Sequence, residues 1–346
     1  VKVNKQKPVI RTILRSSVYQ LKYMDHVPDS AVCNEAVKLA GKKGFVNLKG
    51  FVNGVLRNIS RNPDMVSYPD PSNEIACLSV RYSLPMWMVE KWISVYGKET
   101  VEKMGKAFLE ERPVTVRRNT AVVSKEEFEK ELEKDGVVYR RHPVLPYAYE
   151  LTNYDYLAGL LAFQKGYFYI QDISSMQVAE WAEPKEGDYV IDVCAAPGGK
   201  AIHLAEKLSG TGYVEARDLT EYKVALIEEN IERSGLDNIE AVCQDATIND
   251  EASYEKADIL IADLPCSGLG ILGKKPDLKS KMTVEMAKGL ADLQRQILTV
   301  VHNYVKPGGK LLYSTCTINR EENEDNTAWF VENFPEFEKI REKQML

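Results

Sequence analysis

Several features that define common protein classes are missing from this sequence of 346 residues. No apolar run approaches the roughly 18 residues of a membrane-spanning helix. The first residues, Val1 to Lys5, do not form a signal peptide. The six cysteines include no Cys-x-x-Cys pair, so we expect neither a disulfide framework nor a metal site. These absences favour a reducing, cytoplasmic setting in which thiols stay available for chemistry.

What the sequence does contain is typical of a globular protein, but its charge is divided unevenly. The chain is 44% hydrophobic and 28% charged, and its length predicts two or three domains. The net charge is −6, yet residues 1–72 hold 12 Lys and Arg against 5 Asp and Glu, a local net charge of +7. A basic segment joined to an acidic one can bring an RNA backbone to an enzyme. A solvated basic surface explains the same composition equally well.

The basic segment, residues 1–72, is expected to be helical. Apolar residues recur at helical spacing from Ile10 to Leu21, and a second helix over 31–40 follows a cap at Asp29-Ser30. A third helix is expected over 47–59. Residues 60–75 contain three prolines among polar residues, which is typical of a linker.

Residues 73–165 predict a small α+β module. Helices are expected over 85–96 and 99–109, and strands over 114–118 and 137–139. Ser124 precedes a charged helix with Glu127 three residues later, which is the spacing of a capping box.

The third segment, residues 166–346, alternates regularly between strands and helices, which predicts an α/β fold with a doubly wound, mainly parallel sheet. Strands are expected over 189–195, 212–217, 239–243, 257–263 and 310–315. Helices are expected over 199–209, 220–234, 284–305 and 321–333.

Two cysteines stand where this fold places its ligands. Cys266 follows the fourth expected strand within Asp263-Leu264-Pro265-Cys266, and Cys316 follows the fifth within Ser314-Thr315-Cys316. Ligands of open α/β sheets lie at the carboxyl ends of the strands. Each of the two cysteines is in a turn, whereas Cys33, Cys77 and Cys243 lie in apolar patterns and are assigned to packing.

A glycine turn and two acids predict an adenosine-containing cofactor. The turn Cys194-Ala195-Ala196-Pro197-Gly198-Gly199-Lys200 lacks the Gly-x-Gly-x-x-Gly spacing of dinucleotide enzymes, but it opens a helix whose N–H groups can face a ligand. Asp218 ends the second strand, where an acid commonly binds ribose hydroxyls. Asp245 ends the third strand and could receive a base amino group.

These motifs carry a resemblance to a family. Asp192 to Lys200, Asp263 to Gly268 and Tyr313 to Thr317 resemble motifs I, IV and VI of the RNA cytosine-C5 methyltransferases of the Nop2/Sun family. Residues 166–175 resemble the lead into that family's catalytic domain, and residues 49–57 resemble the end of a NusB-like domain. A NusB-like domain in front of this catalytic domain is found in the bacterial RsmB type, which modifies small-subunit (16S) ribosomal RNA.

The resemblance implies a fold and a reaction. The fold would be a Rossmann-like methyltransferase domain that uses S-adenosylmethionine, preceded by an all-α NusB-like domain and the α+β module. Cys316 would be the nucleophile that adds to cytosine C6, and Cys266 would assist breakdown of the adduct. Asp263 would bind the base near N3 and also touch the cofactor, while Lys200 would lower a thiol pKa or provide charge at the site. The target cytosine would have to be unstacked.

The same resemblance supplies the cofactor and RNA contacts. S-adenosylmethionine would lie against residues 194–200, with Asp218 on the ribose and Asp245 near the adenine. Ribosomal RNA would contact four basic residues, Lys274, Lys275, Lys49 and Arg57. A monomer is expected, as is a chain shortened at both ends relative to the family.

One further departure from the family pattern and several alternatives stay open at this point. Asn319-Arg320 follows motif VI where a proline and an acid are commoner. One alternative is a NusB-like RNA-binding adaptor with an inactive methyltransferase domain, and another is a cytosine-C5 methyltransferase acting on tRNA. Methylation of an exocyclic amine would need no thiol. A dinucleotide oxidoreductase is disfavoured by the form of the first glycine turn.

Overall fold

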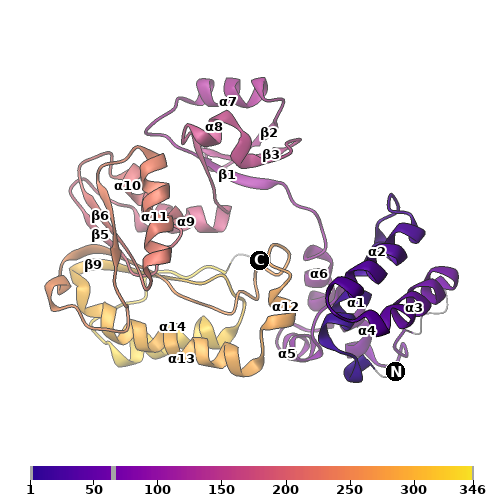
Figure 1. Cartoon of the computed structure of the whole chain (residues 1–346). Coiled ribbons are helices and arrows are strands. Elements are labelled where there is room, and N and C mark those ends of the chain that lie inside the picture. Colours follow the sequence, from indigo (N-terminus) through magenta and orange to yellow (C-terminus); the bar gives the residue numbers. More distant parts are fainter. Residues whose placement is uncertain (1–2, 64–67, 345–346) are drawn as a thin grey trace. The chain divides into compact units, whose positions relative to one another are not determined.

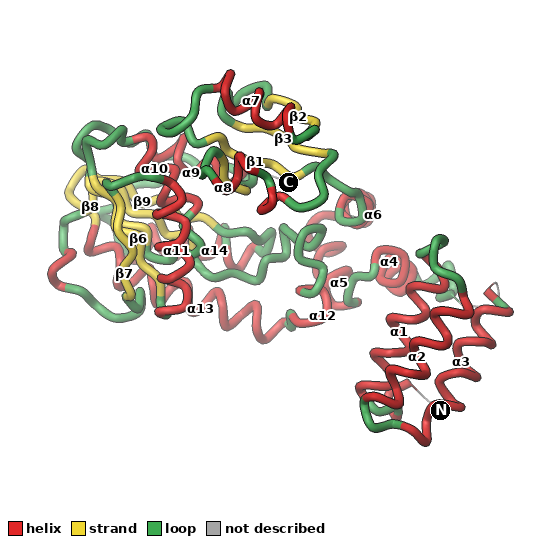
Figure 2. The backbone as a smooth tube through the Cα atoms, turned by 45° about the horizontal axis from the view of Figure 1, so that its top comes forward, coloured by secondary structure: helices red, strands yellow, loops and turns green. Residues whose placement is uncertain are grey.

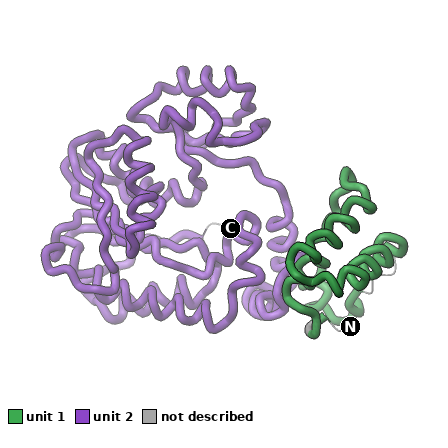
Figure 3. Tube along the Cα trace, viewed as in Figure 1, with its two compact units in different colours: residues 1–80 green, residues 81–346 purple. Residues whose placement is uncertain are grey.

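The computed structural model describes residues 3–63 and 68–344, and its contacts divide the chain into two compact units, residues 1–80 and 81–346 (Figure 3). Part of the linker predicted over 60–75 lies outside the described residues. Among the described residues, no helix combines the length and the apolar character needed to cross a membrane.

The first unit is built from helices, as predicted. They are α1 (Pro8–Tyr23), α2 (Asp29–Lys42), α3 (Lys49–Arg61) and the start of α4 (Glu74–Tyr82). The apolar faces of α1, α2 and α3 form one core, which consists of Ile10, Ile13, Leu14, Cys33, Ala36, Ala40, Val52 and Leu56. The predicted cap at Asp29-Ser30 is wrong, because α2 begins at Asp29 after Pro28 and has no side-chain cap. The Asp29 carboxylate instead accepts a hydrogen bond from Ser60 Oγ at 2.5 Å.

The second unit begins with helices α5 (Met86–Tyr96) and α6 (Lys98–Ala107), followed by a four-stranded antiparallel sheet (Figure 2). Its strands are β1 (Val114–Arg118), β2 (Val138–Arg141), β3 (Ala148–Thr152) and β4 (Phe168–Ile170), in the order β2-β3-β1-β4. Helices α7 (Lys125–Lys134) and α8 (Leu161–Gln164) accompany this sheet. Ser124 caps α7 as predicted, since its Oγ accepts from the N–H of Glu127 at 3.2 Å. The sequence prediction missed β3 and β4.

The rest of the second unit is a five-stranded sheet in which every pairing is parallel. The strands are β5 (Tyr189–Asp192), β6 (Tyr213–Asp218), β7 (Ile239–Cys243), β8 (Ala257–Asp263) and β9 (Val305–Ser314), in the order β7-β6-β5-β8-β9. The helices are α9 (Ile173–Ala182), α10 (Gly199–Lys207), α11 (Glu221–Ser234), α12 (Leu278–Lys281), α13 (Val284–Val301) and α14 (Glu324–Asn333) (Figure 1).

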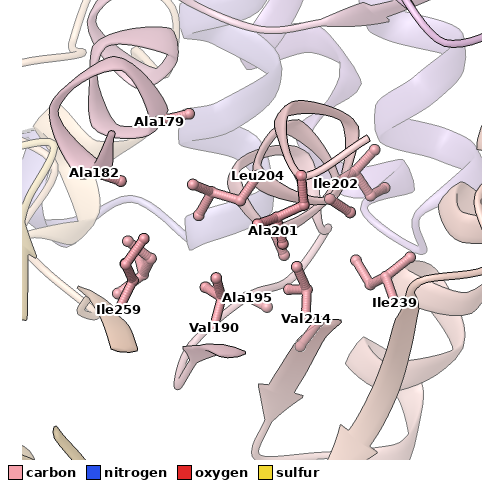
Figure 4. Packing of buried hydrophobic residues seen from close by; sticks show 14 of the residues in the cluster. Ala179, Ala182, Val190, Ala195, Ala201, Ile202, Leu204, Val214, Ile239 and Ile259 are labelled. Atoms are coloured by element: carbon pink, nitrogen blue, oxygen red, sulfur yellow. The ribbon is translucent and has the colours of Figure 1, made fainter. Parts of the chain in front are cut away.

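Both faces of this sheet are covered, which explains the nearly continuous apolar runs of its strands. Side chains of α9, α10 and α11 pack on one face, where Ala179, Leu204 and Val214 are fully buried (Figure 4). Side chains of α13 and α14, among them Leu298, Val301 and Phe330, pack with β8 on the other face. The predicted doubly wound α/β fold is confirmed.

The strand order places the point where the sheet changes direction between β5 and β8. The chain runs outward from β5 to β6 and β7, and then returns to add β8 on the other side of β5. In such sheets the ligand crevice lies outside the carboxyl ends of the strands at this point. The glycine turn that follows β5 and the Asp-Leu-Pro-Cys turn that follows β8 are therefore neighbours.

Candidate active site

The two cysteines predicted to be reactive lie side by side. Strands β8 and β9 are paired so that Asp263, the last residue of β8, is opposite Ser314, the last residue of β9. Cys266 follows the end of β8 by three residues, and Cys316 follows the end of β9 by two. The sulfur atoms of Cys266 and Cys316 are 2.9 Å apart, and the N–H of Cys316 donates to Cys266 Sγ at 3.2 Å. Both cysteines are free, Cys316 being exposed and Cys266 half-buried.

The environment makes the two thiols unequal. A hydrogen bond from Cys266 lowers the pKa of Cys316, with smaller contributions in the same direction from the charges of Lys275 and Lys200. Desolvation and the charge of Asp263 oppose this effect. The pKa of Cys266 is raised by its interaction with Cys316 and by burial. Both effects act in the direction that makes Cys316 the more acidic of the two thiols.

Both carboxylate oxygens of Asp263, which lies next to the cysteines, accept a hydrogen bond from a side chain. Lys200 Nζ contacts Oδ2 at 2.5 Å, and Ser314 Oγ donates to Oδ1 at 2.6 Å. Lys200 lies in the first turn of α10, and its side chain is 17% exposed. The Asp263 side chain is 30% exposed, so it stays accessible to a ligand. The structure thus brings together four predicted residues, Cys266, Cys316, Asp263 and Lys200, from three different strand ends.

The predicted cofactor turn opens α10. Gly198 has φ +105°, a backbone conformation that favours glycine, and a Cβ atom there would lie 3.3 Å from the side chain of Ile202. No side chain caps α10, so the N–H groups of its first turn stay available to an anionic or polar ligand.

A buried carboxylate lies directly before this turn. Asp192 is 1% exposed; its Oδ1 accepts from the N–H of Cys194 at 3.3 Å, while Oδ2 is buried with no hydrogen-bond partner among the described residues. Burial, assisted by the nearby Asp263, raises the pKa of Asp192 to about 7.

The two other acids lie at the ends of β6 and β7, as predicted. Asp218 is 3% exposed and already accepts hydrogen bonds from the N–H groups of Ala196 and Leu219 and from Lys223 Nζ at 2.8 Å. Asp245 Oδ1 accepts from the N–H and the hydroxyl of Thr247. Their contacts with ribose and adenine stay predictions.

The sequence analysis missed the residue that connects the two cysteine loops. Glu322 is fully buried, and its carboxylate takes four hydrogen bonds. Oε2 accepts from Ser267 N at 2.8 Å and Gln294 Nε2 at 3.2 Å, and Oε1 accepts from Ser267 Oγ at 2.5 Å and Asn319 Nδ2 at 2.9 Å. Because Ser267 follows Cys266 and Asn319 lies three residues after Cys316, Glu322 joins both loops. Its position in a polar run gave no signal of burial.

The basic residues predicted to contact RNA differ in their surroundings. Lys274 contacts the carboxylate of Asp172, and Lys275 is near enough to Cys316 to affect its pKa. In the first unit, Arg57 is exposed and donates to Asn53 at 3.0 Å, whereas Lys49 is half-buried against Gly41 of α2. Their contacts with RNA stay predictions.

Two further sequence features can be settled here. Cys243 is exposed at the end of β7, so its assignment to packing is wrong, whereas Cys33 is buried as expected. Residues 268–273, which the sequence analysis did not consider, have the Gly-x-Gly-x-x-Gly spacing, but no helix starts there, because α12 begins only at Leu278. The N–H of Gly270 donates to Cys316 O at 3.1 Å. This segment therefore supports the cysteine loop and does not form a dinucleotide-binding turn.

Comparison with known proteins identifies the family. The family model described as 16S rRNA methyltransferase RsmB/F matches residues 179–345, that of the NusB family matches residues 1–61, and a ferredoxin-like domain of RsmF/B-like methyltransferases matches residues 84–155. The probable ribosomal RNA small subunit methyltransferase B of Bacillus subtilis is 37% identical over 340 residues, covering 97% of this chain and 75% of that protein. The chain belongs to the ribosomal RNA small subunit methyltransferase B family.

Other relatives and solved structures agree with this family. The ribosomal RNA small subunit methyltransferase B of Cronobacter sakazakii is 29% identical, covering 94% of this chain and 74% of that one. The crystal structure of PH0851 superimposes with a TM-score of 0.85 at 28% identity, covering 96% of this chain and 75% of the other. The structure of NSun6 from Pyrococcus horikoshii with SFG has a TM-score of 0.63 at 26% identity, covering 70% and 86%. The predicted domain types and the resemblance are thereby confirmed.

Proposed function

We propose that this protein transfers a methyl group from S-adenosylmethionine to C5 of a cytosine in ribosomal RNA of the small subunit. The observation that carries the proposal is the Cys266–Cys316 pair, in which one thiol is set to lose its proton and the other to keep it. The kind of RNA is inferred from the names of the relatives, which are ribosomal RNA small subunit methyltransferases. The cofactor is supported by a solved relative that contains SFG, an analogue of S-adenosylmethionine.

The residues around the glycine turn fit S-adenosylmethionine. Gly198 with its positive φ, the uncapped start of α10 and the unpartnered Oδ2 of Asp192 form a polar cradle at the carboxyl ends of the strands. Residues 194–200, Asp218, Asp245 and Asp263 would hold the cofactor. When bound, it supplies an electrophilic methyl group on a positively charged sulfur.

The cysteines activate and release the base. Carbon C5 of cytosine is a weak nucleophile, so the Cys316 thiolate first adds to C6; the Sγ–C6 bond forms, and the electron pair of the C5–C6 double bond moves towards C5 and the ring. Asp263, fixed by Lys200 and Ser314, lies beside the cysteines and would bind the base near N3, where charge develops.

Release reverses the addition. Once C5 carries the methyl group, its proton leaves to a base, the C5–C6 double bond reforms, and Cys316 departs with the electron pair of the Sγ–C6 bond. Cys266 carries a proton 2.9 Å from that sulfur and would stabilise the departing thiolate by donating to it. Both carbons must be reached from outside the ring plane, so the target cytosine has to be unstacked.

Two substitutions test the division of labour. Cys316→Ala should abolish both methyl transfer and covalent capture of RNA that contains 5-fluorocytosine; retained transfer would refute the assignment. Cys266→Ala should accumulate a covalent protein–RNA species on a denaturing gel, because the loss of Cys266 slows release more than addition. Free release of RNA from Cys266→Ala would contradict its role.

The nature of the RNA has its own test. Bisulfite sequencing of small-subunit ribosomal RNA from a deletion strain should show one or more cytosines that have lost their methylation. The purified protein should methylate these cytosines again. Methylation of tRNA in place of ribosomal RNA would favour the tRNA alternative. No methylation of either RNA, with RNA binding preserved, would favour the adaptor.

A further inference from the structure

Three tyrosines and one lysine form an exposed cluster on the first unit. Tyr19 and Tyr23 lie one turn apart on α1, with ring centroids 5.2 Å apart and ring planes inclined by 44°. Lys22 Nζ is 5.6 Å from the ring centroid of Tyr23 and 5.1 Å from that of Tyr68, whose hydroxyl it contacts at 2.5 Å. We call Tyr19, Lys22, Tyr23 and Tyr68 the tyrosine cluster.

The rings of this cluster have no role in the core. Tyr19 is 59% exposed, Tyr23 63% and Tyr68 62%. The core of the unit uses the opposite face of α1, through Ile10, Ile13 and Leu14. A single exposed tyrosine is ordinary on protein surfaces. Two rings beside the Lys22 ammonium group, with the Tyr19 ring packed against one of them, leave a concentrated area of ring surface in contact with solvent.

Helix α1, which carries three of the four residues of the cluster, is positively charged. Helix α1 contains three basic residues, Arg11, Arg15 and Lys22, and no acidic residue. Arg15 is exposed one turn before Tyr19 and so lies on the same face of the helix. The hydrogen bond with Tyr68 raises the pKa of Lys22, which keeps this lysine charged. The chemistry of the face therefore matches a polyanion that also offers flat aromatic groups.

We propose that the tyrosine cluster is a stacking platform for unpaired bases of the RNA substrate, with Lys22 and Arg15 on the neighbouring phosphates. The identity of the RNA rests on the proposed function, whereas the binding itself does not. Bases stack on aromatic side chains only where they are not already stacked in a duplex, so the platform selects single-stranded segments. A cytosine that must be unstacked for methylation occurs in that kind of segment.

Binding of two RNA probes by the full chain tests the platform. The probes are a fluorescein-labelled single strand of mixed sequence and the same strand annealed to its complement. The variant with Tyr19→Ala, Tyr23→Ala and Tyr68→Ala should bind the single strand at least about tenfold more weakly, because each stacked base contributes on that order. Its affinity for the duplex should stay within about twofold of the original. Tyr19→Phe with Tyr23→Phe should preserve binding, since both rings remain.

A lysine variant and two control variants distinguish base stacking from electrostatic attraction as the source of RNA binding. In a plot of the logarithm of the RNA affinity against the logarithm of the salt concentration, Lys22→Ala should reduce the slope by about one, because one phosphate contact is lost. Tyr156→Ala, which removes a 71% exposed tyrosine in the second unit, and Lys38→Ala, which removes a 68% exposed lysine side chain on α2, should leave single-strand binding unchanged. RNA carrying 5-iodouridine should crosslink on irradiation to peptides containing Tyr19, Tyr23 or Tyr68.

Three outcomes overturn the platform. They are unchanged single-strand affinity in the triple alanine variant, an equal loss for single strand and duplex, which would indicate charge alone, and crosslinks confined to other peptides. Failure of the proposed function looks different. A chain that binds single strands through the cluster but methylates no ribosomal RNA would refute the reaction and keep the platform. Methylation with an unchanged KM for RNA in the triple variant would refute the platform alone.

Discussion

At the scale of single residues, the site depends on unequal proton affinities of similar groups. Cys266 and Cys316 are separated by one hydrogen bond between sulfurs, and two such close groups cannot both become anions at neutral pH. The charges of Lys275 and Lys200 help to lower the pKa of Cys316, whereas the contact with Cys316 and burial raise the pKa of Cys266. The negative charge of the pair is therefore expected on Cys316, the cysteine that is exposed to a substrate.

Cys266→Ala should raise the pKa of Cys316, because the largest influence that lowers it is the hydrogen bond from Cys266. The pH dependence of iodoacetamide alkylation, followed on the Cys316 peptide by mass spectrometry, should move to higher pH. Cys266→Ser retains a hydroxyl donor and should move it less. An alkylation profile that is the same in all three proteins would show that Cys266 does not influence the nucleophile.

Asp192 should make the protein less stable as the pH rises. Its pKa is raised to about 7 when folded, against an unfolded value of about 4, so between these values the folded state holds a proton that the unfolded state lacks. This contribution is fully present below pH 4 and declines as the pH rises to 7, by up to about 4 kcal/mol for a shift of roughly three units.

Urea unfolding at pH 5.5 and pH 8 measures this effect. Asp192→Asn cannot ionise, so it should lose less stability over that interval than the original protein. A difference between the two pH values that is the same in both proteins would contradict the raised pKa.

Residues predicted from the sequence share one property: their neighbours along the chain form a motif. Cys266, Cys316 and the 194–200 turn were placed correctly at the strand ends because each stands between a strand and a turn. Glu322 and Ser314 were missed because their roles depend on partners 51 or more residues away, Ser267 and Asp263. No local pattern distinguishes a glutamate that folds into the interior from one that faces water.

At the scale of elements, the geometry of the site depends on the loops after β8 and β9. Neither loop is regular structure, yet the sulfur atoms they carry are held in contact. Glu322 supplies the connection, since its four hydrogen bonds come from both loops and from Gln294 of α13. No Lys or Arg is among these four donors, so the carboxylate is stabilised by hydrogen bonds alone.

Glu322→Gln should therefore lower kcat and leave the KM for RNA nearly unchanged. A glutamine offers one acceptor oxygen and one amide, so some of the four donors would face another donor. We expect a loss of about 1–3 kcal/mol in the free energy of unfolding and a 10- to 100-fold lower kcat as the cysteines separate.

Glu321→Gln is the matched control, because the neighbouring Glu321 is exposed and its carboxylate forms an ion pair with Lys91. Steady-state kinetics and urea unfolding of the two variants would be compared. Equal kcat values in Glu322→Gln and Glu321→Gln would show that the connection between the loops does not matter for the reaction.

Elements were predicted well where apolar runs are long and poorly where turn residues interrupt them. Strands β5 to β8 match their predicted ranges within three residues. Strand β9 begins at Val305, five residues earlier than expected, because Pro307, Gly308 and Gly309 indicate a turn in the sequence. Strand β4 has three residues and an exposed Ile170, which is too short for a periodicity to be recognised.

At the scale of the whole molecule, the second unit combines two sheets that the sequence places in separate domains. Arg117 of β1, fully buried, donates to Gln171 at 2.7 Å and forms an ion pair with Glu206 of α10. Asn119, also fully buried, donates to Ser234 O at the end of α11 and to Gly166 O, both at 3.0 Å. Polar groups that are buried between the sheets favour one geometry, because separation or sliding leaves them unpaired.

The two sheets of the second unit should consequently unfold together, and Asn119→Ala should destabilise both. The substitution leaves the carbonyl groups of Gly166 and Ser234 without this donor, at a cost of about 2 kcal/mol. Native-state hydrogen exchange should then become about 30-fold faster in β1 and β3 and equally in β5 and β8, since 1.4 kcal/mol corresponds to a factor of ten. Asn249→Ala, which removes an exposed side chain bonded to Tyr254, is the control. Faster exchange in the antiparallel sheet alone would show that the module opens without the catalytic sheet, and that the polar contacts between them do not join the two into one cooperative structure.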